Sequence, residues 1–279
     1  MKSSLPYNYL IPNVSALPEG HRCLLGPPFA TIGAQLSPGV HEVDWRVRVF
    51  RNGEELSNWS RRLRFDNGEL AGPPPDPFIW DQTVGDNWRP DPCFLESDFV
   101  SVADEVIFSS NIQPSFYAIF TAPGRKSFFS DSGVKFGLAI VVNQVRAYGK
   151  YADCYLPVSI DRDADYDESI VMINPYRKDI ISRILFSDGR SLDRIRINGG
   201  SARFIRLSDI LGADENSWSG SIQITANNRI ITFSVKHSLA NPEIIHDYEH
   251  LDAYRAERTH LPLFRKLRQF YGAYRANLV

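Results

Sequence analysis

Two histidines and a glutamate near the end of the sequence could bind zinc. They form the run H-D-Y-E-H at residues 246–250. If this run is helical, His246 and His250 lie one turn apart and could hold the metal, while Glu249 polarises a water molecule for hydrolysis. An N-P-E run at residues 241–243 indicates a helix start just before it. Because only 29 residues follow, a third ligand from a distant downstream helix has no room, and two solvated histidines on a polar helix face are the other interpretation.

Aspartates occupy every second position from 161 to 167, and Glu168 follows them. In an extended segment alternate side chains point to one side, and Ca²⁺ prefers gathered carboxylate oxygens. An EF-hand loop is excluded because Tyr166 stands at the sixth position, where glycine is required. A calcium or magnesium site and a solvated acidic linker remain as alternatives. The metal ligands would be Asp161, Asp163 and Asp165.

A Pro-rich loop at residues 72–92 combines aromatic and acidic side chains. Indole faces stack on the C–H bonds of sugar rings while carboxylates accept hydroxyl protons, so this mixture is typical of a carbohydrate site. Long loops without regular structure are usually functional or disordered. The other interpretation is that the aromatic rings plug the end of a β-sandwich. The candidate ligand contacts are Phe78, Trp80, Trp88, Asp81 and Asp86.

The segment 262–279 has helical spacing and a basic character. Residues 255–279 hold six arginines and lysines against one glutamate, in a chain whose formal net charge is −2. A basic amphipathic helix suits packing on its own module, docking on a second subunit, or an acidic membrane surface. We expect self-association, because a symmetric exchange would bury the same stripe in both subunits. The apolar stripe consists of Leu263, Leu267, Phe270 and Tyr274.

The elements that would position these residues are strands. Between Glu168 and Ser238, short apolar runs recur about every 11 residues with Asn, Asp, Gly and Pro between them. This spacing is typical of antiparallel β-sandwiches, and no run reaches the length that a helix needs. The predicted strands are 169–173, 180–186, 192–197, 203–207, 219–224 and 231–236.

A second β-rich region precedes that one. Valines and a tryptophan alternate with charged residues over 42–49, as in a strand with one buried face, and Asn52-Gly53 predicts a hairpin turn into a return strand that carries Trp59. Further strands are predicted at 105–108, 115–121, 126–129 and 137–142. The predicted fold is therefore all-β, with two β-sandwich modules of the immunoglobulin or jelly-roll kind and a C-terminal amphipathic helix. The predicted boundaries are 20–160, 161–240 and 241–279.

Four segments of the C-terminal module resemble the strand series of the sensory rhodopsin transducer family. They are E-S-I-V-M-I-N at 168–174, F-I-R-L-S-D at 204–209, S-G-S-I-Q at 219–223 and I-T-F-S at 231–234. The family is a small cytoplasmic β-sandwich that oligomerises and is similar to carbohydrate-binding modules. The resemblance covers about a quarter of the chain and brings no catalytic motif with it. It implies a non-enzymatic binding role.

Length and composition limit the possible domain organisation, partners and location of the protein. A chain of 279 residues with 43% hydrophobic content has room for two modules with real cores, and a net charge of −2 excludes a globally basic nucleic-acid binder. We find no signal peptide and no apolar run that approaches a membrane span, so no transmembrane segment is expected. Three widely spaced cysteines are most simply reduced thiols, which indicates a cytoplasmic protein.

These features predict a non-enzymatic binding or interaction protein. Its ligand would be carbohydrate-like or a protein partner, and it would form oligomers. No cofactor is expected unless calcium or zinc occupies one of the sites above. The alternative is a hydrolase, either metal-dependent with Glu249 beside His246 and His250, or a glycoside hydrolase that uses acids of the Trp loop.

Overall fold

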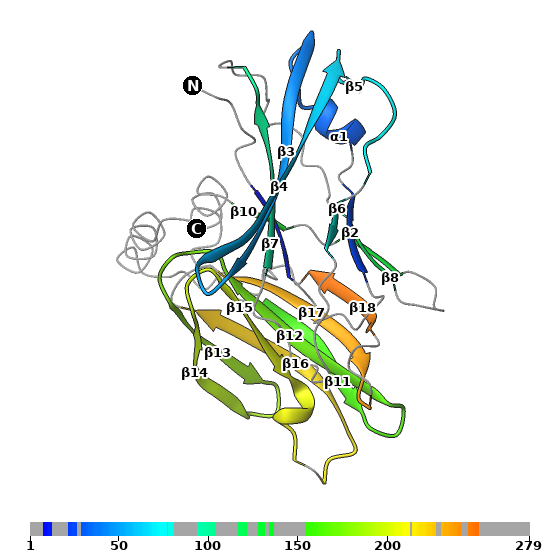
Figure 1. Ribbon diagram of the computed structural model, residues 1–279. Helices are drawn as coiled ribbons and strands as arrows, with labels where there is room; N and C mark the ends of the chain where they lie inside the picture. The colour runs from blue at the N-terminus through cyan, green and yellow to red at the C-terminus, as the bar shows by residue number, and fades with distance from the viewer. Residues whose placement is uncertain are drawn as a thin grey trace.

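A computed structural model describes residues 8–12, 22–26, 29–76, 78–80, 94–103, 117–121, 128–131, 134–136, 154–212, 214–226, 230–240 and 245–250. Within these ranges the chain is mostly β-strand, and the strands form two modules that follow each other in sequence (Figure 1). The all-β prediction is confirmed. No helix in the described ranges is long and apolar enough to cross a membrane.

The N-terminal module, the upper one in Figure 1, contains two antiparallel sheets. The larger has the strand order β10-β1-β7-β3-β4-β5 and the smaller β6-β2-β8-β9. A short helix, α1 (Phe29–Gly33), precedes β3. The strands are β1 (Asn8–Pro12), β2 (Arg22–Gly26), β3 (Val40–Arg51), β4 (Glu54–Asp66), β5 (Glu69–Leu70), β6 (Phe78–Trp80), β7 (Phe94–Ser101), β8 (Tyr117–Thr121), β9 (Phe128–Asp131) and β10 (Val134–Phe136).

The long β3–β4 hairpin follows directly from its sequence. Its apolar residues from Val43 to Val49 are buried, and the charged residues between them are more exposed. Asn52 and Gly53 have φ values of 51° and 82°, which the twist of a two-residue hairpin turn demands and which asparagine and glycine tolerate. The predicted hairpin is therefore confirmed.

Aromatic rings join the two N-terminal sheets. Trp45 and Trp59, from β3 and β4, meet edge to face with centroids 4.8 Å apart. Phe78 of β6 lies 5.3 Å from Trp59, so it ties the smaller sheet to the larger one. The indole N–H of Trp45 donates to Ser97 Oγ at 2.9 Å, which satisfies the one polar group of this buried side chain.

The C-terminal module is one curled antiparallel sheet. Its halves have the orders β14-β13-β16-β11 and β15-β12-β17-β18, and they are joined where β11 and β12 pair at Asp161 and Tyr166 alone. The halves therefore fold over each other, and Ser182 Oγ of one approaches Met172 Sδ of the other at 3.5 Å. The strands are β11 (Cys154–Asp161), β12 (Tyr166–Asn174), β13 (Ile180–Phe186), β14 (Ser191–Ile197), β15 (Ser201–Arg206), β16 (Ser217–Ala226), β17 (Ile231–Ser238) and β18 (Ile245–His250). A 3₁₀ turn, η1 (Leu207–Asp209), follows β15.

The core of this module lies along β12 and β17, which are buried on both faces. Burial on both faces explains why residues 170–173 are continuously apolar and do not alternate with polar residues. Five apolar residues of the predicted strands are fully buried, whereas Ile195 of β14 is only half-buried. The five are Ile170, Met172, Ile222, Phe233 and Val235.

The six predicted C-terminal strands are present as β12 to β17. The two predicted boundaries of this module differ from the structure. The curled sheet begins at Cys154, before the predicted start at 161, and it includes β18, which was predicted to belong to the helical tail at 241–279. The strands predicted at 115–121 and 126–129 correspond to β8 and β9. The strands predicted at 105–108 and 137–142 and the helix at 262–279 lie outside the described residues.

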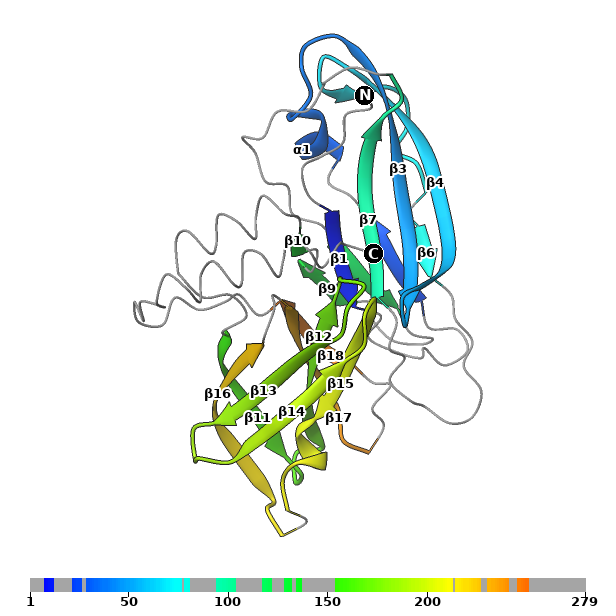
Figure 2. The ribbon, with the colours of Figure 1, turned by 90° about the vertical axis from the view of Figure 1, so that its left-hand side faces the viewer.

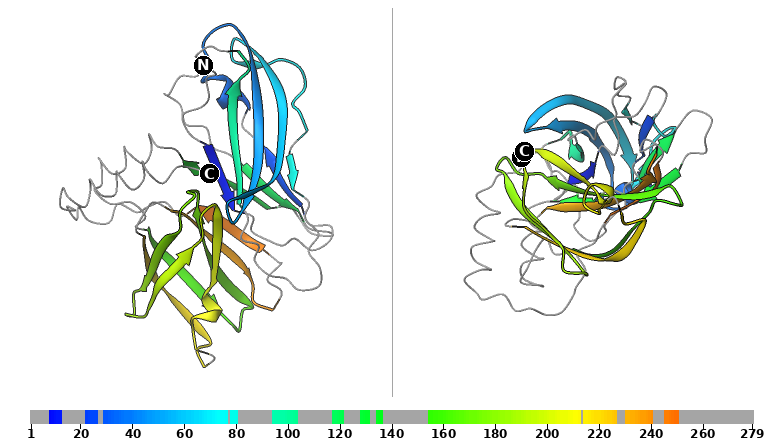
Figure 3. Two further views of the ribbon diagram at one scale, coloured as in Figure 1. Left: turned by 60° about the vertical axis from the view of Figure 1, so that its left-hand side comes forward. Right: turned by 90° about the horizontal axis from the view of Figure 1, so that it is seen from below.

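The tip of the β3–β4 hairpin reaches the C-terminal module (Figures 1 and 2). Gly53 N donates to the carbonyl oxygen of Gly200 at 3.0 Å, and Gly200 N donates to Tyr176 O at 2.7 Å. Figure 3 shows the two modules and the hairpin in two further views. Two turns that the sequence predicts separately thus meet at the junction of the modules.

Candidate functional site

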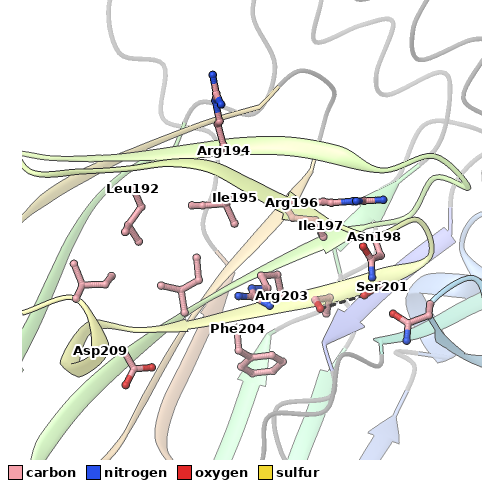
Figure 4. Close-up of a pocket in the computed structure, with 14 residues that line it drawn as sticks. Leu192, Arg194, Ile195, Arg196, Ile197, Asn198, Ser201, Arg203, Phe204 and Asp209 are labelled. Atoms are coloured by element: carbon pink, nitrogen blue, oxygen red, sulfur yellow. Dashed lines mark hydrogen bonds between the residues drawn. The ribbon is translucent and has the colours of Figure 1, made fainter.

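An open groove of about 700 Å³ lies between β14 and β15, on the side of the C-terminal module that meets the hairpin tip (Figure 4). In Figure 4, Leu192 points from β14 toward β15, and Arg203 projects from β15 into the space between the strands. The floor of this β14–β15 groove is apolar and its rim is charged. Its lining includes Leu192, Ile195, Ile205, Arg196, Arg203 and Asp209.

A second hollow, of about 730 Å³, continues the first toward the N-terminal module. Both are lined by Asn52 of the hairpin tip, by Arg196 of β14 and by Asn198 of the β14–β15 turn. We call the two hollows together the junction groove. The second is lined by Arg48, Phe50 and Glu55 of the N-terminal module and by Arg177, Asp179 and Gly199 of the C-terminal module.

Asp179 fixes the wall between the two hollows. Its Oδ2 accepts from Arg196 Nε at 2.7 Å, and its Oδ1 accepts from Gly199 N at 3.0 Å. The hydrogen bond from Arg196, followed by that from Gly199, holds the pKa of the Asp179 carboxyl below its usual value. The ionised carboxylate therefore locks the β14–β15 turn and the direction of the Arg196 side chain.

Positive charge predominates in the junction groove. Five arginines line it against three acids. Arg177 and Arg203 are exposed, and neither has an ion-pair partner in the described part of the chain. By contrast, Arg48 pairs with the buried Glu96 at 2.7 Å. Arg177 and Arg203 are therefore free to bind an anionic group, and guanidinium groups bind carboxylates and phosphates through paired N–H donors.

Strand β14 carries a β-bulge beside this groove. Ser182 and Ile184 of β13 pair with Ile195 and Leu192, so two residues of β14 oppose one of β13. One of the two, Arg194, has a φ of 57° in the left-handed region that non-glycine residues rarely adopt. The bulge interrupts the regular pairing of β14 at the middle of the groove.

The H-x-x-E-H motif is not helical. Residues 245–250 form β18, which pairs antiparallel with β17 and covers its edge. A strand does not bring residues four positions apart onto one turn, so the helical arrangement that a zinc peptidase needs is absent. The predicted helix is therefore wrong over residues 245–250, where pairing with the edge of β17 outweighs the local signal and Lys236 Nζ of β17 donates to Asp247 at 2.9 Å. The helix start predicted at 241–243 lies outside the described residues.

The acidic run at 161–167 is a hairpin turn and not a linker. Asp161 Oδ1 accepts from Asp163 N and Ala164 N at 3.1 Å each, which caps the turn between β11 and β12. Asp165 accepts from Ser238 Oγ at 2.6 Å and from Ala240 N at 2.7 Å, and these bonds, Ser238 first, lower the pKa of its carboxyl. Among the described residues no group of three or more His, Cys, Asp or Glu side chains is placed to hold a metal ion.

The aromatic loop is divided by a strand. Phe78 is 6% exposed and packs in the core against Trp59, which excludes it as a ligand contact. Trp80 ends β6, where its backbone is in register with Cys23 of β2. The other predicted contacts, Trp88, Asp81 and Asp86, lie outside the described residues.

A serine and a histidine in the C-terminal core resemble a nucleophile and its base. Ser169 Oγ lies 2.7 Å from His237 Nε2, and His237 Nδ1 lies 2.9 Å from Ser238 O. Burial lowers the pKa of His237, which favours the neutral ring. Ser169 and His237 are each 2% exposed, so the pair joins β12 to β17 inside the core and is closed to a substrate.

Glu168 is buried beside that pair. Its carboxylate accepts from Ser159 N at 3.0 Å and from Ser234 Oγ. Burial nevertheless raises the pKa of Glu168, with the hydrogen bond from Ser234 as the largest opposing effect. Its carboxyl group satisfies donors of β11 and β17 and thereby holds the two halves of the curled sheet together.

Sequence reasoning missed the arginines of the junction groove. Arg196 and Arg203 flank the Asn198-Gly199-Gly200 turn, and Arg177 follows the Asn174-Pro175 break. The only indication in the sequence is that these arginines lie beside predicted turns. Their convergence depends on the hairpin tip at Asn52, which is far away in the sequence. No protein-family model matches this chain, and no curated protein is similar to it at a significant level.

Proposed function

We propose that this protein is a non-enzymatic binding protein that holds an extended acidic ligand, an acidic segment of a protein partner, in the junction groove. The observation that carries the proposal is the position of Arg177 and Arg203, exposed and without an ion-pair partner among the described residues, along two adjoining hollows. Small-molecule sites are usually enclosed and mostly apolar. An open groove with an arginine rim is better suited to a chain-like anionic ligand.

The shape of the groove supports a ligand that touches both modules. Arg48 and Glu55 come from the hairpin and Arg177 and Arg196 from the C-terminal module. A ligand that spans both walls gains contacts only when the modules hold their present arrangement. Ligand binding is therefore expected to stabilise that arrangement by mass action.

Titration calorimetry at low salt with three soluble probes tests this function. The probes are a polyglutamate peptide, an oligogalacturonate of similar charge and an uncharged Gly-Ser peptide. We expect the acidic peptide to bind and the uncharged one not to. The double variant Arg177→Glu/Arg203→Glu should bind about five- to thirtyfold more weakly, since each of the two exposed pairs contributes about 0.5–1 kcal/mol.

The matched control is Arg64→Glu, an exposed arginine of β4 that lines neither hollow. It should leave the affinity unchanged. Equal affinity of the double variant and the wild type, or equal binding of the uncharged peptide, would overturn the proposal. Stronger binding of the oligogalacturonate than of the peptide would identify an acidic carbohydrate as the ligand.

Self-association through the basic segment 262–279 stays a proposal. Its support is the charge contrast between this segment and the rest of the chain, together with the resemblance of 168–238 to an oligomeric family. Deletion of 262–279 should convert an oligomer into a monomer or a poorly soluble species. Light scattering that gives the same number of subunits for the full-length and the truncated protein, with both soluble, would contradict it.

A further inference from the structure

Consecutive strands β14 and β15 are joined by a short turn but do not pair with each other. Among the described strands, β14 pairs with β13 and β15 pairs with β12. Each therefore presents one edge to the groove between them (Figure 4). Backbone N–H and C=O groups alternate in direction along a strand, so about half of those in each strand point toward the groove.

The two edges differ in their capacity to accept another strand. The bulge at Asp193 and Arg194, with its left-handed backbone, breaks the regular spacing of β14. Bulges of this kind are a common device by which proteins protect sheet edges from pairing. By contrast, all six residues of β15 from Ser201 to Arg206 stay in unbroken register with β12. Its edge is a regular template.

The side chains that line the groove determine which residue types an added strand should carry. Leu192, Ile195 and Ile205 are half-buried and form an apolar floor. Arg196 and Arg203 are exposed on the rim, where Asp209 is the single acid. Successive side chains of a strand point to opposite sides, so a segment that alternates acidic with β-branched apolar residues would meet both surfaces at once.

We propose that the acidic ligand binds by β-strand addition, as an extended segment of a partner protein that pairs with the groove-facing edge of β15, with which no described strand pairs, and alternates acidic with apolar residues. This inference rests on the proposed function, because it specifies how the same groove is used. Main-chain hydrogen bonds to β15 supply affinity, the arginines select acidic side chains, and the apolar floor takes the alternate ones. The added strand covers the open side of the curled sheet.

Amide hydrogen exchange and fluorescence anisotropy on the full chain test the mode of binding. The probe is a fluorescein-labelled heptapeptide that alternates glutamate with valine. Two N-methylated versions carry methyl groups on alternate sets of amides, so each keeps the charge and removes one row of backbone donors. We expect at least one version to bind at least tenfold more weakly than the parent, and exchange of the 201–206 amides to slow when the parent binds.

The outcomes separate this inference from the function on which it rests. Parent-like affinity of both methylated peptides, or unchanged exchange at 201–206, overturns strand addition even if acidic peptides bind. Absence of binding by every acidic probe overturns the proposed function as well. Arg203→Glu should weaken binding of the parent peptide, and Arg64→Glu should leave its affinity unchanged. An isomer with the same composition but with its glutamates in one block should bind less tightly, and equal affinity of the two isomers counts against the proposal.

Discussion

Gly53 donates its backbone N–H to Gly200 at 3.0 Å, so the tip of the longest hairpin in the described chain rests on the turn between β14 and β15. Both positions have positive φ, 82° at Gly53 and 60° at Gly200, which glycine adopts without a Cβ clash. The contact places Asn52 beside Asn198 and Arg196, and thereby completes the wall of the junction groove.

Gly199→Ala should destabilise the protein. A Cβ at this position would lie far inside van der Waals contact of the Arg177 carbonyl oxygen, a backbone atom that can move only with its turn. Overpacking of this kind costs about 1–3 kcal/mol. Urea denaturation measures the loss. Gly212→Ala, where an added Cβ meets no atom within 4 Å, is the control, and an equal change in both variants would contradict the prediction.

Phe233→Ala should cost about 3–5 kcal/mol of unfolding free energy, because it removes a large side chain that is fully buried at the centre of β17. Such a loss is a large part of the stability of an ordinary domain. Thermal denaturation followed by circular dichroism measures it. Ile181→Ala, at a position of β13 that is 41% exposed, is the comparison, and a similar shift in the two melting temperatures would show that Phe233 is not a core residue.

Glu168→Gln should stabilise the protein increasingly as the pH rises above 4.5. Burial raises the folded-state pKa of Glu168 above its ordinary value of 4.5, so folding takes up a proton in the window between the two values. This contribution to stability is present below pH 4.5 and is lost as the pH rises through the folded-state pKa. Glutamine does not titrate, and its amide can keep the bonds to Ser159 and Ser234.

The melting temperature of Glu168→Gln relative to wild type, measured from pH 4 to pH 8, checks this sign. The difference in stability should grow with pH and then level off, at about 1.4 kcal/mol for each pH unit that separates the folded-state pKa from the unfolded-state pKa. Glu69→Gln, at an exposed position of β5, is the control. A difference that shrinks as the pH rises would mean that the hydrogen bonds to the carboxylate outweigh its burial.

Asp179→Asn should bind the acidic peptide about two- to fivefold more tightly than wild type, since it removes a negative charge from the wall of the groove and releases Arg196. The side-chain oxygen can still accept from Gly199 N, so the turn is retained. Anisotropy titration measures the change, which added salt should reduce. Asp66→Asn, at an exposed position that lines neither hollow, should have no effect, and weaker binding by Asp179→Asn would be evidence against an electrostatic groove.

The sequence predicts strands well where turn residues separate apolar runs, as in β12 to β17. It fails where a distant partner determines the structure. In β7, Glu96 and Asp98 are buried, which the local pattern argues against, because Arg48 and Arg46 of β3 pair with them. No local signal indicates those partners.

The same reason explains the failures at the candidate sites. The residues of β18 have a helical motif, yet the edge of β17 orders them as a strand. The acidic run suggests a linker or a metal site until Ser238 and Ala240 supply its donors from a distant part of the chain. The groove could not be predicted because its arginines converge only after the hairpin tip meets a turn that lies far away in sequence.

The β3–β4 hairpin has a mechanical consequence for the junction. A strand of 12 residues is about 40 Å long, and this ribbon is anchored at both ends. At the far end Asn67 and Gly39 exchange hydrogen bonds of 2.8 and 3.0 Å, and Gly33 of α1 packs closely on Gly68. The hairpin therefore acts as a stiff lever, and a tilt of about 3° at its base moves its tip by about 2 Å over this length. A shift within the N-terminal module would therefore move Asn52, which lines the groove. The stiffness of the hairpin thus determines how far the width of the groove can change.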